Sequence, residues 1–185
     1  MSDVPFQNPA QPAPAEVLAS LCVIPVTHYD FLGLERTGEI LMCKALVDDV
    51  RDFFALAHQL KFPIESVIPI HEPPFFFDDT KSCLANNSSG FNYRYVYNTT
   101  RLSKHSFGTA FDVNPVQNIY CTYDVEGKET YRLPANGVYD PQSPGTLTAD
   151  HELVLFMKRR GWTWGGDWTI ESGRVDYQHF EKPLK

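Results

Sequence analysis

The segment Ser-Lys-His-Ser-Phe-Gly-Thr-Ala-Phe-Asp at residues 103–112 is followed near the C-terminus by Asp-Tyr-Gln-His-Phe at residues 176–180. Together the two segments hold two imidazoles and two carboxylates. Catalytic zinc sites use about three nitrogen or oxygen ligands from the protein and leave a further position open for water. His105, Asp112 and His179 therefore form a candidate ligand set for one zinc ion.

Asp176 is the carboxylate that this ligand set leaves over. It could accept a proton from the attacking water, which is the task of a general base. The alternative is that Asp176 accepts a hydrogen bond from a ligand histidine and only orients it. The residues alone leave both roles open.

The first ligand segment predicts a turn followed by a strand. Gly108 would let the backbone turn after His105, and residues 109–113 then alternate between two faces. Phe111 and Val113 share the face that would be anchored in the core, so a rigid element would carry the ligand on the other face.

The spacing of Asp176 and His179 does not fit a regular strand. Residues i and i+3 point to opposite faces of a strand, although they share a face of a helix. Because the flanking residues favour a strand, we expect a bend, bulge or strand end between the two.

Two segments predict amphipathic helices. Apolar side chains recur at helical spacing over residues 44–60, and Pro63 follows the end of this pattern. A second helix is predicted over residues 151–160, with Thr148 as the candidate N-cap and Gly161 at the C′ position.

Other segments predict strands and loops. Residues 64–70 are rich in β-branched side chains and predict a strand. The three phenylalanines at 75–77 predict core and strand packing. Residues 122–147 contain several turn dipeptides and predict an irregular insertion, which often borders a binding cleft.

Length and composition predict one compact domain. A chain of 185 residues with 43% hydrophobic content can bury a single core. Residues 1–20 hold four prolines among small and polar residues, without the pattern of a signal peptide, and predict a flexible lead-in to a domain at residues 21–185. No apolar run approaches the roughly 18 residues that a membrane span needs.

Charge and cysteine spacing exclude other classes of function. The net charge of −7 argues against nucleic-acid binding, which relies on clustered Lys and Arg. The four cysteines include no Cys-x-x-Cys pair, which argues against a structural zinc or thioredoxin-type site. Buried thiols are expected, and one or two disulfides stay possible in an oxidising compartment. The cysteines are Cys22, Cys43, Cys83 and Cys121.

The ligand segments also resemble a known family. Ser-x-His-x-x-Gly-x-Ala-x-Asp followed by a distal Asp/Glu-x-x-His is similar to the signature of the LAS-type zinc peptidases, which include D-alanyl-D-alanine carboxypeptidases and L-alanyl-D-glutamate peptidases. Further segments resemble the L-alanyl-D-glutamate peptidase branch, at residues 37–39, 86–94, 100–103, 112–115 and 164–168.

The resemblance implies a fold and a set of roles. The fold is of the α+β class, with helices packed on a mainly antiparallel sheet that carries one zinc site, as in LAS and hedgehog domains. Asp176 takes the position of the base. Arg94 is expected to stabilise the oxyanion, with Arg101 as the competing candidate.

Three further residues are candidates for substrate contact, each with a plainer alternative. Ser103 could bond the ligand loop or only its own backbone. Trp164 and Trp168, in Trp-Gly-Gly-Asp-Trp, could line the substrate site or form a tight turn between core aromatics.

The function implied by the resemblance is hydrolysis of peptidoglycan stem peptides. L-alanyl-D-glutamate endopeptidase is the first expectation and D-alanyl-D-alanine carboxypeptidase the alternative. A non-catalytic zinc module of the hedgehog type is the alternative from a different class. The enzyme would act at the bacterial cell wall, in the periplasm or outside the cell, by an export route that the sequence does not reveal. An injected toxin would also bind an immunity protein.

Overall fold

The computed structural model describes residues 6–184, and its longest strands form a hairpin. β1 (Leu21–Tyr29) pairs antiparallel with β2 (Glu35–Cys43). Alternate side chains of β1 such as Ile24 and Val26 are buried, which places one face of the hairpin against the core.

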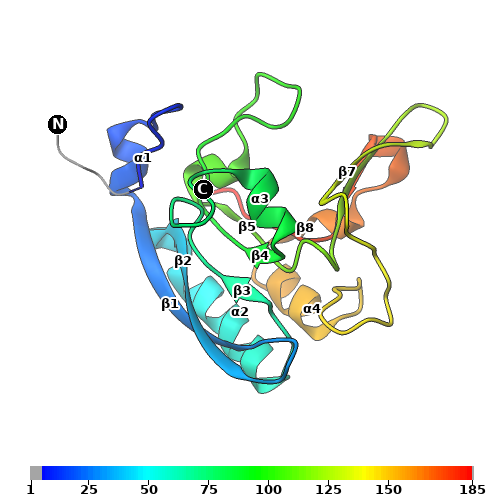
Figure 1. Ribbon diagram of the computed structural model, residues 1–185, viewed down its shortest axis with the longest axis horizontal. Coiled ribbons are helices and arrows are strands. Elements are labelled where there is room, and N and C mark those ends of the chain that lie inside the picture. Colours follow the sequence, from blue (N-terminus) through cyan, green and yellow to red (C-terminus); the bar gives the residue numbers. More distant parts are fainter. Residues whose placement is uncertain (1–5, 185) are drawn as a thin grey trace.

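The helix predicted over residues 44–60 is confirmed. It begins as the 3₁₀ turn η1 (Lys44–Leu46) and continues as α2 (Val47–Gln59). Figure 1 shows α2 lying along the β1–β2 hairpin. The residues buried on its apolar face are Val50, Phe53, Phe54 and Ala57.

The second predicted helix is also present, as α4 (Glu152–Arg159), but its N-cap was predicted wrongly. Nδ1 of His151 accepts a hydrogen bond from the N–H of Leu153 at 3.2 Å. The Thr148 hydroxyl instead donates to the carboxylate two residues further on. Gly161 follows the helix with a φ of 83°, in the left-handed conformation expected at C′.

Two three-stranded antiparallel sheets carry the candidate site. The first has the order β5 (Ala110–Asp112), β10 (His179–Glu181), β8 (Thr163–Trp164). Behind it, the Phe111 ring lies 5.1 Å from that of Phe53 and 5.2 Å from that of Phe180. This sheet is therefore backed by the aromatic core.

The second sheet corrects the prediction for residues 122–147. Its order is β7 (Glu129–Leu133), β6 (Tyr120–Tyr123), β9 (Arg174–Asp176). The expected irregular insertion thus begins with a hairpin, whose turn is closed by the Asp124 carboxylate accepting from two backbone N–H groups. The turn dipeptides marked the hairpin turn and the irregular chain after it, but not the strands.

The strand predicted over residues 64–70 is much shorter than expected. Only β3 (Ser66–Val67) forms, parallel to β4 (Asn87–Ser88). The Asn87 side chain accepts from the N–H of Ile68 and donates to its carbonyl, each at 2.9 Å. A side-chain amide therefore satisfies backbone groups that a partner strand would otherwise pair.

Short elements complete the described chain. Within the predicted lead-in, α1 packs Val17 and Leu18 against a cluster that includes Leu41 and Phe91. The flexibility of residues 1–20 stays a prediction, and residues 1–5 lie outside the described part. The short elements are α1 (Ala15–Ala19), α3 (Asp79–Leu84), η2 (Lys104–Phe107), η3 (Gly165–Asp167) and η4 (Ile170–Ser172).

Two smaller expectations have different outcomes. The phenylalanines at 75–77 lie in turns rather than a strand, with Phe75 buried and Phe76 exposed. All four cysteines are free thiols; Cys22 is partly buried and the other three are buried.

The architecture is a mixed α/β arrangement that is compatible with the expected α+β class. The strands form four small sheets instead of one, and all pair antiparallel except β3 and β4. Among residues 6–184, no helix is both long and apolar enough to cross a bilayer.

Candidate metal centre and its cavity

Two of the candidate ligands face each other across neighbouring strands. In the β5–β10 register His179 lies opposite Asp112, and Phe180 lies opposite Phe111. Because successive residues point to opposite faces, the two ligands share one face while the two phenylalanines enter the core.

His105 reaches the same point from η2. Oγ of Ser103 caps this turn by accepting from the His105 N–H at 3.3 Å. Gly108 ends it in the left-handed conformation, where a Cβ atom would lie 2.6 Å from the backbone nitrogen of Cys43. Glycine is therefore required here by both conformation and space.

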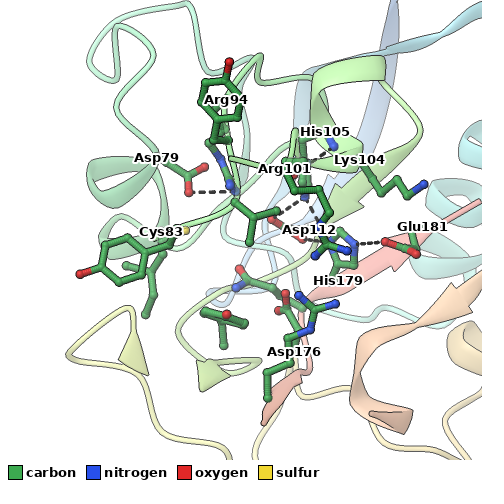
Figure 2. A pocket seen from close by; sticks show the side chains of 18 of the residues that line it. Asp79, Cys83, Arg94, Arg101, Lys104, His105, Asp112, Asp176, His179 and Glu181 are labelled. Carbon is green, nitrogen blue, oxygen red and sulfur yellow. Dashed lines mark hydrogen bonds and ion pairs between the residues drawn. The ribbon is translucent and has the colours of Figure 1, made fainter. Parts of the chain in front are cut away.

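The three donors form a tight cluster (Figure 2). Nε2 of His105 lies 3.1 Å from Nδ1 of His179 and 3.2 Å from Oδ2 of Asp112. Oδ1 of Asp112 lies 3.0 Å from Nδ1 of His179. All three side chains are buried.

The outward nitrogens of both histidines have acceptors. Nδ1 of His105 donates to the carbonyl of Gly90 at 2.7 Å, and Nε2 of His179 donates to the carboxylate of Glu181 at 3.1 Å. Burial lowers the pKa of His179, but Asp112 and Glu181 outweigh burial and raise it to about 10. A cation that displaces the inward proton would meet lone pairs on both inward nitrogens, next to the Asp112 carboxylate. Three converging lone-pair donors fit a cation, and hydrogen-bonded outward nitrogens are usual for metal-ligating histidines.

Electrostatics keep the Asp112 carboxylate charged. Burial alone would raise the pKa of Asp112, but His105 and His179 outweigh burial and hold it well below its ordinary value. The hydrogen bond from His179 likewise lowers the pKa of Glu181. The cluster therefore contains an anionic oxygen beside two imidazole nitrogens.

Asp176 is the last residue of β9, and two residues separate it from His179, where β10 begins. The predicted break between the two is therefore present, since they belong to strands of different sheets. Burial raises the pKa of Asp176 to about 7; His179 lowers it and Asp112 raises it further. Oδ1 of Asp176 is buried without a hydrogen-bond partner. A carboxyl in this state suits proton transfer near neutral pH.

Arg94 lines the same cavity and is held by Asp79. Nη2 of Arg94 lies 3.0 Å from Oδ2 of Asp79, whose other oxygen accepts from the Asn92 amide at 3.1 Å. Nε of Arg94 is buried without a partner. The neighbouring Asp78 caps α3, whereas Asp79 binds Arg94.

The cavity has a volume of about 400 Å³ and connects these groups. Of the candidate substrate contacts, Arg101, Ser103 and Trp168 line it. Trp164 does not: it is 1% exposed, and its Nε1 donates to the carbonyl of Tyr177 at 2.8 Å. The structure thus places Trp164 in the core, which was the alternative for this residue.

The remaining histidines lie away from the metal cluster. His58 bonds Glu35, His71 lies near Glu72, and His151 caps α4. His28 is buried on β1.

Sequence reasoning missed the groups that orient the ligands and the arginine. The Gly90 carbonyl carries no side-chain signal. The role of Glu181 did have a sequence signal, because a residue two positions after His179 on a strand points to the same face as His179. The partner role of Asp79 depends on a contact across 15 residues of chain and has no local signature.

The fold and the site together place three clustered donors that could hold a metal ion, and a separate carboxyl, in one cavity. The comparison with protein families agrees: residues 97–182, just under half of the chain, match a family described as D-alanyl-D-alanine carboxypeptidase. The matched segment contains the three candidate ligands and Asp176, whereas Arg94 precedes it. No curated protein and no solved structure gave a significant match.

The family match supports a relationship to the LAS-type zinc peptidase superfamily and peptidase activity on peptidoglycan-related substrates. It does not distinguish an endopeptidase from a carboxypeptidase.

Proposed function

We propose that this protein is a zinc-dependent peptidase that hydrolyses peptidoglycan stem peptides. The observation that carries the proposal is the convergence of His105, Asp112 and His179, with both outward histidine nitrogens hydrogen-bonded. When bound there, zinc supplies Lewis-acid chemistry: it lowers the pKa of a water and polarises the scissile carbonyl.

Asp176 is the proposed general base and acid. Its carboxylate would take a proton from the attacking water and return it to the amine of the departing peptide. The raised pKa and the unpartnered Oδ1 support this role, since a carboxyl already committed to a strong hydrogen bond would be a poorer base.

Arg94 is the proposed oxyanion partner. A guanidinium fixed by Asp79 would place positive charge beside the carbonyl oxygen as that oxygen becomes negative. Arg101 also lines the cavity but lies on an exposed segment without an ion-pair partner among the described residues. This contrast favours Arg94 as the positioned group.

We propose cleavage between L-alanine and D-glutamate, on the resemblance of residues 86–94 and 164–168 to that branch. D-alanyl-D-alanine carboxypeptidase is the second candidate, because the matching family carries that description. The retained Asp176 favours either enzyme over a zinc module that acts only by binding.

The decisive experiment is digestion of purified peptidoglycan, followed by mass spectrometry of the released fragments. We expect new N-terminal D-glutamyl fragments that disappear with chelator and return with added zinc. Loss of terminal D-alanine alone would select the carboxypeptidase. Intact stem peptides in the presence of zinc would refute the enzymatic proposal.

A further inference from the structure

The arginines of this chain divide into paired and unpaired groups. In the described structure five of the eight form ion pairs with carboxylates: Arg36, Arg51, Arg94, Arg132 and Arg160. The three that form none within residues 6–184 are Arg101, Arg159 and Arg174. Two of these three, Arg101 and Arg174, line the cavity.

Arg174 is held in place without an anionic partner. It lies on β9, and its guanidinium carbon lies 4.4 Å from the centre of the Trp168 indole ring. Trp168 in turn lies 5.6 Å from the His179 ring. Stacking restrains the plane of a guanidinium and leaves the N–H groups at its edge able to bind an anion.

The cavity carboxylates are nearly all committed to other groups. Asp112 contacts both ligand histidines, Glu181 bonds His179, and Asp79 binds Arg94. Asp176 forms no ion pair with any described residue, and so it does not pair with Arg174. Within residues 6–184 Arg101 and Arg174 therefore form no ion pair, although Arg174 is near enough to Glu181 to help lower the pKa of that carboxyl.

The arrangement of charge adds to this contrast. The chain as a whole carries a net charge of −7, yet Arg101, Arg174 and Lys104 line one cavity without ion pairs in the described structure. Figure 2 shows Arg101 and Lys104 toward the Glu181 side of the metal cluster, and Arg94 with Asp79 on the other side. The lining holds four Arg and Lys side chains and four carboxylates, so what distinguishes Arg101, Lys104 and Arg174 is that they form no ion pair among the described residues and can still bind an anionic group.

We propose that Arg174, together with Arg101, forms a subsite for a free carboxylate of the substrate peptide and so determines specificity. This inference rests on the proposed peptidase function. A guanidinium binds a carboxylate through two parallel hydrogen bonds, which gives geometric selectivity as well as affinity. A stem peptide offers such a group at its C-terminus and another on its γ-linked D-glutamyl residue.

The test uses three versions of the peptide L-Ala-γ-D-Glu-L-Lys-D-Ala-D-Ala: the free acid, the C-terminal carboxamide, and the form with D-isoglutamine in place of D-glutamate. Turnover is measured by chromatography with the wild-type protein. Affinity is measured by calorimetry with the Asp176→Asn variant, so that binding is read without cleavage.

One of the two amides should bind and react about 10- to 100-fold more weakly than the acid, as expected for loss of a hydrogen bond between charged groups. The amide that suffers this penalty identifies which carboxylate is recognised. Arg174→Gln should weaken the binding and slow the turnover of the acid peptide, and should largely remove the difference between the acid and the amide. Arg101→Gln should reduce that difference.

Arg159→Gln is the matched control, because Arg159 is also unpaired in the described structure but lies on α4 and does not line the cavity. It should keep the full acid-to-amide difference. Zinc content of each variant checks that the metal cluster is intact.

Equal affinity and turnover for the acid and both amides would overturn the inference while leaving the peptidase proposal standing. The inference would also be overturned if amidation of the peptide reduced affinity and turnover as much in Arg174→Gln and in Arg101→Gln as in the wild-type protein. Failure of the wild-type protein to cleave any of the three peptides or peptidoglycan would refute the peptidase proposal itself.

Discussion

The cavity has two walls whose side chains are held in different ways. The ligand wall consists of His105, Asp112 and His179, which are buried, hydrogen-bonded on their outer sides and backed by the core. The outer wall consists of Arg94, Arg101, Trp168, Arg174 and Asp176, which come from β9, the loop before η2 and the segment after η3.

Three of the seven buried polar atoms that have no partner in the described structure lie in or beside the outer wall. Asp176, Arg94 and the adjacent Gln178 each have a buried polar atom without a partner, whereas none of the three ligand side chains does. Buried polar atoms are normally paired, so unpaired ones in a cavity mark places where a reacting molecule can supply the partner. The side chains of the ligand wall are fixed by hydrogen bonds. The side chains of the outer wall still have donors and acceptors that can bind the substrate.

The largest effect is expected in the ligand wall. His105→Ala, Asp112→Ala or His179→Ala should each deplete the roughly one zinc per chain that a three-ligand site implies, and should reduce hydrolysis to background. Metal analysis of the purified variants checks this. His58→Ala, which alters a histidine bonded to Glu35 outside the cluster, is the control and should keep its zinc. Full zinc occupancy in all three ligand variants would remove the basis of the comparison.

A large loss without metal loss is expected at Asp176. Asp176→Asn should keep zinc and the fold but lose about 10²- to 10⁴-fold in kcat, because an amide cannot accept the water's proton. Single-turnover measurements with zinc-loaded protein test this. Asp176→Glu should retain part of the activity. Near-normal turnover by Asp176→Asn would reduce Asp176 to an orienting role.

A smaller loss is expected at Arg94. Arg94→Lys should lower kcat by about 10²- to 10³-fold, because an ammonium does not reproduce the planar donor set aimed at an oxyanion. Arg101→Lys should be milder, since it keeps the charge on an exposed segment. If instead Arg101→Lys were crippling and Arg94→Lys harmless, the oxyanion role would pass to Arg101.

The smallest effect on the site is expected from Asp49, which lies in neither wall. Its carboxylate binds Arg160, the Trp162 indole and Lys182 at 2.7–3.0 Å and ties α2 to the C-terminal part of the chain. Asp49→Asn should lower the free energy of unfolding by about 1–3 kcal/mol at neutral pH while zinc content and kcat stay unchanged.

The same variant gives a pH test. Burial alone would raise the pKa of Asp49, but Lys182, Trp162 and Arg160 together lower it below the ordinary value of 3.8. A depressed folded-state pKa contributes stability above the unfolded pKa, and this contribution is lost as the pH falls through the folded value. Urea unfolding of wild type and variant should therefore converge in acid. A gap that stays constant down to low pH would show that the charge of Asp49 is not its source.

The local parts of the fold could be predicted from the sequence. The helices near residues 44–60 and 151–160 and the turn at Gly108 follow from periodicity and backbone preference within a few residues. The hairpin β6–β7 and the short β3 were missed because strand pairing depends on a partner elsewhere in the chain. For Ile68 that partner is the Asn87 side chain.

By itself, the sequence determined which residues could bind a metal and perform proton transfer, because the residue types and their short spacing can be read directly from it. The tertiary structure decided which atoms meet: the β5–β10 register sets His179 against Asp112, and Gly90 and Glu181 turn the histidine lone pairs inward. It also placed Trp164 in the core and left Arg174 unpaired within the described residues beside Trp168. These outcomes depend on contacts between residues far apart in sequence, and such contacts have no local pattern from which they could be predicted.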